Sequence, residues 1–81
     1  LVSAAPKWNV VVLNDPINYQ AYVVMAFMNV LRIGAPEAKR LMRTIHAEGR
    51  ATVWTGDRER AEMLSLELQQ WHLNSLLEQD G

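Results

Sequence analysis

The segment WNVVVL, from Trp8 to Leu13, narrows the choice of fold for this chain. Consecutive β-branched residues without polar alternation are typical of a strand that is buried on both faces, or nearly so. Pro16 cannot donate a hydrogen bond to a sheet ladder, so the strand has to end before it. The sequence therefore predicts a buried strand over residues 8–13 that stops at Asn14 and Asp15.

Size and composition set further limits on the fold. The chain has 81 residues, which corresponds to one small domain with a thin core. Hydrophobic residues make up 49% of it, which is enough for folding rather than disorder. Cysteine is absent, so neither disulfides nor thiolate metal sites can stabilise the fold. No apolar stretch approaches the roughly 20 residues needed to span a bilayer, and we expect no membrane partner.

Two helices are predicted after the first strand. Apolar residues recur at helical spacing over residues 18–32, and Asn18 is expected to cap the first turn with its side chain. Gly34 suits the end of this helix. A second helix is predicted over residues 36–48, with a proline in its first turn. Gly49 suits the left-handed residue that closes it.

A strand, a third helix and a final strand complete the predicted order. The segment ATVWT, residues 51–55, is expected to be a strand, and HLNSLLE, residues 72–78, a short final one. Asp57 is expected to cap the third helix, with Glu59 in the first turn, where the helix dipole favours acids. The apolar residues expected to be buried by this helix are Ala61, Leu64, Leu66, Leu68 and Trp71.

The predicted order is β-α-α-β-α-β, which places the chain in the α+β class. Three strands and three helices of this size favour a small two-layer sandwich, with a three-stranded sheet and helices packed on one face. The folded domain is expected to span residues 8–78. Residues 1–7 have no hydrophobic period and are expected to form a flexible tail.

Charge and residue types argue against several classes of function. The net charge is −1, and the basic residues between positions 39 and 50 are diluted by acids, whereas a nucleic-acid binder usually carries a basic stripe. Two distant histidines without cysteine fall short of a metal site. No serine has a nucleophile-elbow context, and the glycines are scattered. We expect no nucleic-acid partner, no metal, no cofactor and no catalysis; a small enzyme using His46 and Asp15 as an acid–base pair is the remaining enzymatic alternative.

The residue types are more favourable for a binding site. Asn14 and Asp15 offer oxygen acceptors, His46 offers a nitrogen acceptor when neutral, and a buried ammonium needs about three such acceptors. An apolar wall beside them would come from Val23, Met42 and Ile45. These residues fit a ligand with an ammonium next to a bulky apolar group, and they equally fit a turn, a helix cap and a core face.

The segments VVVLNDPINYQAYVV, APEAKRLMRTIHAEGRA, RERAE and LNSLLE together resemble one known family, ClpS. ClpS proteins are adaptors that bring N-degron substrates to the ClpA- or ClpC-type AAA+ unfoldase of a Clp protease. The family pattern fits without a gap from Asn14 into the third helix, and it covers nearly the whole chain after residue 7. The resemblance implies a non-enzymatic adaptor that binds a substrate whose first residue is leucine, phenylalanine, tyrosine or tryptophan.

The resemblance also implies a role for each candidate residue. The α-amino group of the substrate would be held by Asn14, Asp15 and His46. The unfoldase would dock on the third helix, at Glu59 and Glu62. The residues expected to line the side-chain pocket are Asn18 and Gln20 at the rim, with Val23, Met42, Ile45 and Leu73 inside it.

The chain departs from the family pattern at a few positions. Gln20 stands where the family usually has methionine, which would narrow or tilt the preference among the four first residues. Pro16 replaces the second aspartate of many members, and Leu64 replaces a lysine near the expected docking face. Only a stub, residues 1–7, corresponds to the flexible extension that ClpS proteins need for substrate hand-off, so we expect the chain to bind substrates but to deliver them poorly.

Two functional alternatives follow from the resemblance. The leading one is an N-degron adaptor that recognises the first residue, and the other is a regulator that docks on the unfoldase without such recognition, for which Gln20 leaves room. We expect a monomer whose partners are the N-terminal segments of substrates and the N-terminal domain of the unfoldase. The expected location is the bacterial cytoplasm, or a plastid stroma if a transit peptide has been removed.

Overall fold

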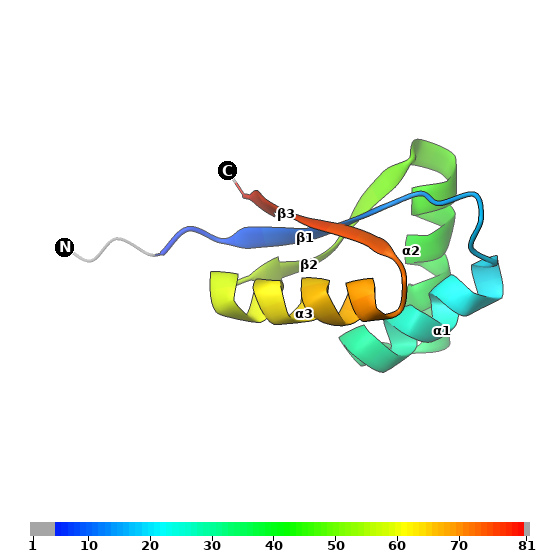
Figure 1. Ribbon diagram of the computed structural model, residues 1–81, viewed down its shortest axis with the longest axis horizontal. Coiled ribbons are helices and arrows are strands. Elements are labelled where there is room, and N and C mark those ends of the chain that lie inside the picture. Colours follow the sequence, from blue (N-terminus) through cyan, green and yellow to red (C-terminus); the bar gives the residue numbers. More distant parts are fainter. Residues whose placement is uncertain (1–4, 81) are drawn as a thin grey trace.

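A computed structural model describes residues 5–80 of the chain (Figure 1). The order β-α-α-β-α-β and the α+β class predicted from the sequence are confirmed. Residues 1–4 of the predicted tail lie outside the described residues, so the division into a tail and a domain at residue 8 stays a prediction. The elements are β1 (Trp8–Leu13), α1 (Gln20–Leu31), α2 (Ala35–Glu48), β2 (Arg50–Gly56), α3 (Arg58–Gln70) and β3 (Asn74–Gln79).

The three strands form one antiparallel sheet with β1 in the centre, in the order β2-β1-β3. Val10 and Val12 belong to the core that the helices cover, while Val11, also fully buried, points to the other face because side chains alternate along a strand. On that other face, Arg50 of β2 forms an ion pair with Glu78 of β3. The prediction of a strand buried on both faces is confirmed.

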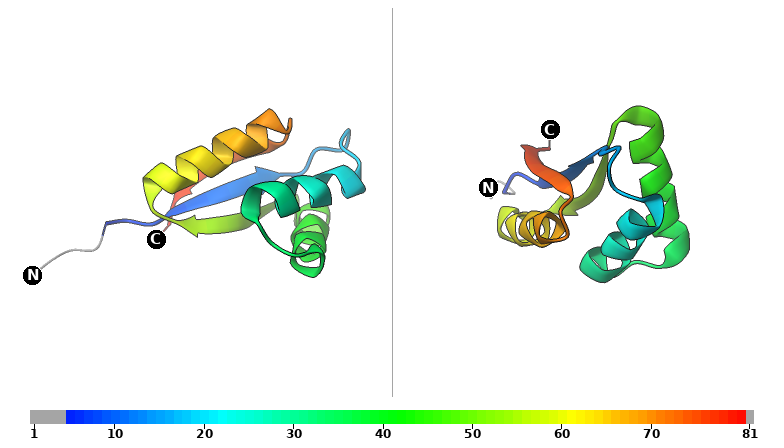
Figure 2. Two further views of the ribbon diagram at one scale, coloured as in Figure 1. Left: turned by 90° about the horizontal axis from the view of Figure 1, so that it is seen from below. Right: turned by 45° about the vertical axis from the view of Figure 1, so that its right-hand side comes forward.

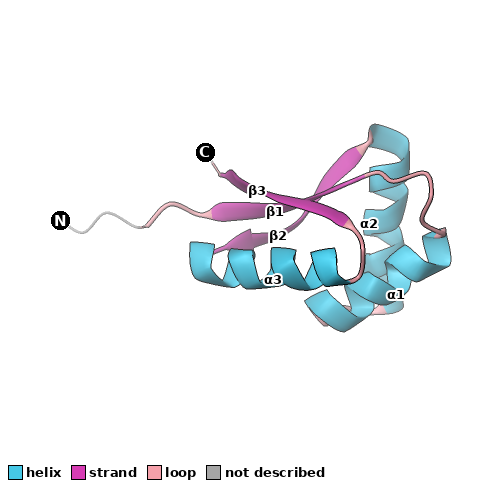
Figure 3. Ribbon diagram, viewed as in Figure 1, coloured by secondary structure: helices cyan, strands magenta, loops and turns pink. Residues whose placement is uncertain are grey.

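The helices occupy one face and one end of the sheet (Figures 2 and 3). α3 runs along the strands and contacts all three of them, whereas α2 contacts β2, and α1 contacts the other two helices. Phe27 of α1 and Leu68 of α3 are among the largest fully buried side chains, which joins the helices in one core. The chain ends of the domain lie at the opposite end of the sheet, where Asp80 N–H donates to the Lys7 carbonyl over 2.8 Å.

The predicted boundaries of α1 are wrong at both ends. The helix begins at Gln20 with Tyr19 in the N-cap position, and no side chain caps it. Asn18 is not the cap, because the helix begins two residues after it; its Nδ2 donates instead to the His72 carbonyl, far away in the sequence. At the other end Arg32 adopts a left-handed conformation, with φ of 59°, and closes the helix; Gly34 is extended and occupies the N-cap position of α2 instead.

The predicted end of α2 and the predicted cap of α3 are confirmed, while α2 begins one residue earlier than predicted, at Ala35. Gly49 has a φ of 86° and closes α2, with its N–H donating to the Ile45 carbonyl over 2.8 Å. The Asp57 carboxylate accepts a hydrogen bond from the Arg60 N–H over 3.0 Å, and Glu59 lies in the first turn of α3.

The predicted buried face of α3 is wrong at one position. Ala61, Ser65 and Leu68 are buried, whereas the Leu66 side chain is 56% exposed. Leu66 follows Ala61 by five residues, which places it about 140° away around the helix. Ser65 takes the interior position, and its hydroxyl hydrogen bonds to that of Ser75 over 2.8 Å.

The final strand begins later than predicted. His72 has a φ of 64°, which is left-handed and incompatible with a strand. His72 therefore belongs to the turn that precedes the strand. β3 begins at Asn74 and ends at Gln79. Leu73 lies between the turn and the strand and is only 5% exposed.

Candidate functional site

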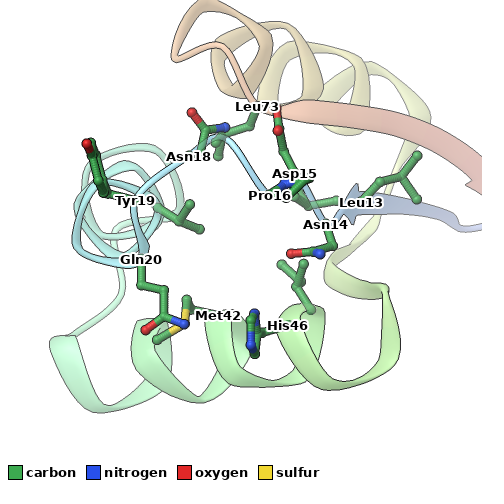
Figure 4. Close-up of a pocket in the computed structure, with 13 residues that line it drawn as sticks. Leu13, Asn14, Asp15, Pro16, Asn18, Tyr19, Gln20, Met42, His46 and Leu73 are labelled. Atoms are coloured by element: carbon green, nitrogen blue, oxygen red, sulfur yellow. The ribbon is translucent and has the colours of Figure 1, made fainter.

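A pocket of about 300 Å³ lies where the end of β1, the start of α1, the second half of α2 and the turn before β3 meet (Figure 4). This volume is at the small end of the range of ligand pockets, and its lining joins a few polar groups to apolar walls, as ligand pockets usually do. The lining residues are Val12, Leu13, Asn14, Asp15, Pro16, Asn18, Tyr19, Gln20, Val23, Met42, Ile45, His46 and Leu73.

The structure brings together the residues that were expected to contact a ligand. Asn14, Asp15 and His46, the candidate acceptors for an amino group, all line the pocket, as do the rim and wall candidates Asn18, Gln20, Val23, Met42, Ile45 and Leu73. Their roles toward a ligand stay predictions. The docking candidates Glu59 and Glu62 are exposed residues of α3, which contributes nothing to the pocket lining.

Backbone contacts hold Asn14 beside the end of α2. The Asn14 N–H donates to the Gly49 carbonyl over 2.9 Å, immediately after β1 ends. Gly49 closes α2 three residues after His46, so this bond ties the end of β1 to the last turn of α2. In Figure 4 the side chains of Asn14 and His46 lie along the same side of the pocket.

Asp15 shapes the loop beside the pocket, and one of its carboxylate oxygens has no hydrogen-bond partner among the described residues. One carboxylate oxygen, Oδ1, accepts from the Ile17 N–H over 2.9 Å, and the Asp15 carbonyl accepts from the Asn18 N–H over 3.2 Å. Such a turn in which aspartate binds its own backbone is common at strand ends. Within residues 5–80, the second carboxylate oxygen, Oδ2, has no hydrogen-bond partner.

His46 stands on the face of α2 that borders the pocket. It follows Met42 by four residues, so the two side chains are neighbours on the helix surface. In the described part of the chain neither the His46 ring nor the Asn14 amide makes a side-chain hydrogen bond. Asn14, Asp15 and His46, each with an acceptor atom that is free within residues 5–80, therefore all line one cavity. In Figure 4 the Asp15 carboxylate points away from the Asn14 amide and the His46 ring.

The apolar wall of the pocket is continuous with the protein core. Val12, Ile45 and Leu73 are buried members of the core cluster and also line the pocket, and Val23 packs against the same cluster. Because close-packed cores deform little, this wall is a rigid surface against which an apolar side chain can pack.

Some pocket residues were not among the predicted site residues: Val12, Leu13, Pro16 and Tyr19. Tyr19 is the most informative of them, because its side chain is 83% exposed at the pocket edge. The helix predicted over residues 18–32 would have placed Tyr19 in its first turn. Its position in the sequence, between the rim candidates Asn18 and Gln20, could have indicated that Tyr19 also lies at the rim.

Metal binding and membrane insertion find no support in the described residues. Over residues 5–80, no group of three or more histidine, cysteine, aspartate or glutamate side chains could hold a metal ion. No helix in the same range is both long and apolar enough to cross a membrane.

Comparison with known proteins decides the family. Residues 3–75 match the family described as "ATP-dependent Clp protease adaptor protein ClpS". The chain belongs to the ClpS family. A ClpS of Mycobacterium leprae is 36% identical over 76 residues, which cover 94% of this chain and 70% of that protein. A ClpS of Mycobacterium marinum is 35% identical over 78 residues, which cover 96% of this chain and 77% of that protein.

A solved ClpS structure agrees with the fold. ClpS2 of Agrobacterium tumefaciens, solved with L-phenylalaninamide bound, superposes with a TM-score of 0.90 at 25% identity, covering 93% of this chain and 98% of that one. The predicted resemblance is thereby confirmed, and the chain is an adaptor of an ATP-dependent Clp protease. ClpS adaptors are not catalytic, which confirms that the chain is not an enzyme.

Proposed function

We propose that the pocket binds the free N-terminal residue of N-degron substrates when that residue is bulky and apolar, and that the chain presents these substrates to a ClpA- or ClpC-type unfoldase. The observation that carries this proposal is the pairing of three polar acceptor groups with an apolar wall in one cavity of about 300 Å³. Further support comes from the ligand of the A. tumefaciens ClpS2 structure, since L-phenylalaninamide joins a free amino group to a bulky apolar side chain.

Recognition of the amino group follows from acceptor chemistry. An ammonium has three N–H donors, and Asn14 Oδ1, Asp15 Oδ2 and a neutral His46 nitrogen can each accept one. Asp15 also supplies the opposite charge, and hydrogen bonds between charged groups are the strong ones. An acetylated or internal residue would leave these acceptors unpaired beside an apolar ligand, at a cost of about 1–3 kcal/mol for each buried group.

Recognition of the side chain follows from burial. A ligand side chain that fills the space beside Val12, Ile45 and Leu73 has its own apolar surface removed from water. Full burial of a leucine or phenylalanine side chain contributes about 1.5–3 kcal/mol. Small first residues would leave part of the cavity unfilled and would bind more weakly.

Gln20 is the position at which we expect the preference among bulky residues to be set. Its carboxamide lies at the pocket edge near Met42 (Figure 4). A bound side chain that covers this amide displaces its water, which costs free energy unless the ligand offers a hydrogen-bonding group in return. Tyrosine and tryptophan carry such a group, whereas leucine and phenylalanine do not.

We place the unfoldase contact on α3, at Glu59 and Glu62. Glu62 already receives a hydrogen bond from Arg58 over 3.3 Å, and both acids are exposed. Because α3 lines no part of the pocket, unfoldase and substrate would occupy separate surfaces. The bacterial origin of the relatives favours the bacterial cytoplasm as the location, and a monomer suffices for both contacts.

Fluorescence anisotropy with a panel of labelled peptides tests the proposed function. The peptides share one sequence and begin with leucine, phenylalanine, tyrosine, tryptophan, valine or glycine. We expect saturable binding of the four bulky residues and at least about tenfold weaker binding of the glycine peptide, the difference of one buried apolar side chain. A different result would favour the regulator that only docks: the chain would bind the N-terminal domain of a Clp unfoldase but would show no preference among the peptides.

A further inference from the structure

The chain reverses sharply where α3 passes into β3, directly behind one wall of the pocket. The Trp71 N–H is shared between the Glu67 and Leu68 carbonyls, at 3.2 and 3.0 Å, and His72 then takes the left-handed conformation. The Leu73 N–H donates back to the Leu68 carbonyl over 3.1 Å, which completes the reversal. Leu73 is thereby turned inward as a buried part of the pocket wall.

The reversal leaves two consecutive carbonyls without helical donors, as happens at every helix end. The Tyr22 hydroxyl donates to the Trp71 carbonyl over 2.6 Å. The Asn18 Nδ2 donates to the next carbonyl, that of His72, over 3.3 Å. Both carbonyls are thus satisfied from α1 or from the loop just before it.

The aromatic rings reinforce the first of these bonds. The ring centroids of Tyr22 and Trp71 are 5.6 Å apart, and the ring planes are inclined at 52°. This tilted arrangement is one of the favourable geometries for aromatic pairs. Both rings are half-buried and pack against the core, which restrains the position of each ring.

We propose that this contact, the corner clamp formed by Asn18, Tyr22, Trp71 and His72, sets the width of the pocket between Leu73 and α1, and that Tyr22 is a positioning residue for first-residue selectivity. The inference rests on the proposed function. Tyr22 itself does not line the pocket, but Val23 follows it directly and forms part of the α1 wall. A loosened clamp lets Leu73 and Val23 move apart, so that wide and narrow side chains fit more equally.

The variant Tyr22→Phe tests the clamp because it removes the hydroxyl and keeps the ring. We expect at most about fivefold weaker binding of a phenylalanine-first peptide, because the lost bond is internal and only part of its contribution affects binding. We also expect a smaller ratio between the affinities for tryptophan-first and leucine-first peptides, and faster hydrogen exchange at the Leu73 amide. Trp71→Phe, which shortens the ring contact, should shift the ratio in the same direction.

Thr55→Val is the matched control. The Thr55 hydroxyl donates to Asn9 Oδ1 over the same 2.6 Å, but at the far end of the sheet, beside the start of β1. In this variant the affinity ratio and the Leu73 exchange rate should stay at wild-type values.

The outcomes separate this inference from the proposed function. If the wild-type protein binds peptides selectively, and Tyr22→Phe keeps the same ratio and Leu73 exchange rate as Thr55→Val, the clamp inference is overturned alone. A wild-type protein that binds none of the peptides would overturn the proposed function, and the selectivity role of Tyr22 with it.

Discussion

The backbone of Gly49 connects the end of β1, next to Asn14, with the last turn of α2, which carries His46. Its N–H donates to Ile45, in the last turn of α2, and its carbonyl accepts from Asn14, after β1. The residue can do both because it adopts a φ of 86°, which glycine tolerates and other residues adopt at a cost. The position of the candidate acceptor Asn14 therefore depends on a residue without a side chain.

Gly49→Ala should destabilise the protein by about 1 kcal/mol. A Cβ at this position would meet no atom within 4 Å, so the cost comes from the backbone conformation alone. Urea denaturation measures it. Gly49→Asn is the matched control, since asparagine adopts the left-handed conformation at a lower cost than alanine does. Equal effects of the two substitutions would show that the left-handed conformation of Gly49 is not what matters.

His46→Ala should weaken binding of free N-terminal peptides by about tenfold or more, because a hydrogen bond to a charged group is worth about 1.5–3 kcal/mol. The fold should survive, since His46 is exposed and makes no side-chain hydrogen bond within the described residues. Anisotropy and a thermal melt of the same sample check both parts. Unchanged affinity in a folded variant would remove His46 from the site.

Asn18 shows what local sequence reasoning could not supply. Its side chain was expected to cap α1, a role that depends only on neighbouring residues. It instead donates to His72, 54 positions away, a contact that exists only once α1 and the end of α3 are packed together. Its place at the pocket rim, by contrast, agrees with the expectation from the family resemblance.

At the scale of the element, α3 is stabilised at its start by a residue remote from the pocket. The Asp57 carboxylate accepts from the Arg60 N–H, one of the donors that a helix start leaves unpaired. Asp57→Ala should therefore lower the free energy of unfolding by about 1 kcal/mol, whereas Asp57→Asn should be nearly neutral because asparagine caps as well. Both variants should bind peptides with wild-type affinity. A drop in affinity for Asp57→Ala, measured on folded protein, would mean that α3 and the pocket are coupled.

The elements themselves were predictable because each carries a strong local pattern, and their ends were less so. Arg32 and His72 both take left-handed conformations that glycine or asparagine usually marks, so neither turn had a sequence signal. The exposure of Leu66 and the burial of Ser65 differ from the prediction because the leucines of α3 do not all lie on one face of the helix.

At the scale of the whole molecule, residues distant in sequence form the pocket because β1 is central and its end faces the last turn of α2. The strand order β2-β1-β3 carries no local signal, so residue types alone left a ligand site and a simple turn equally open. The family resemblance was what connected Asn14 and Asp15 with His46. The structure adds the corner clamp, for which neither source gave an indication.

The central claim is that one pocket recognises a free amino group together with a bulky apolar side chain. Calorimetric titration of the wild-type protein with L-phenylalaninamide and with N-acetyl-L-phenylalaninamide tests it most directly, because the two ligands differ only at the amino group. We expect saturable one-to-one binding of the free amine and at least about tenfold weaker binding of the acetylated compound, since buried acceptors would be left unpaired. Equal affinities, or no binding of either ligand, would contradict the assignment of Asn14, Asp15 and His46 as the amino-group site.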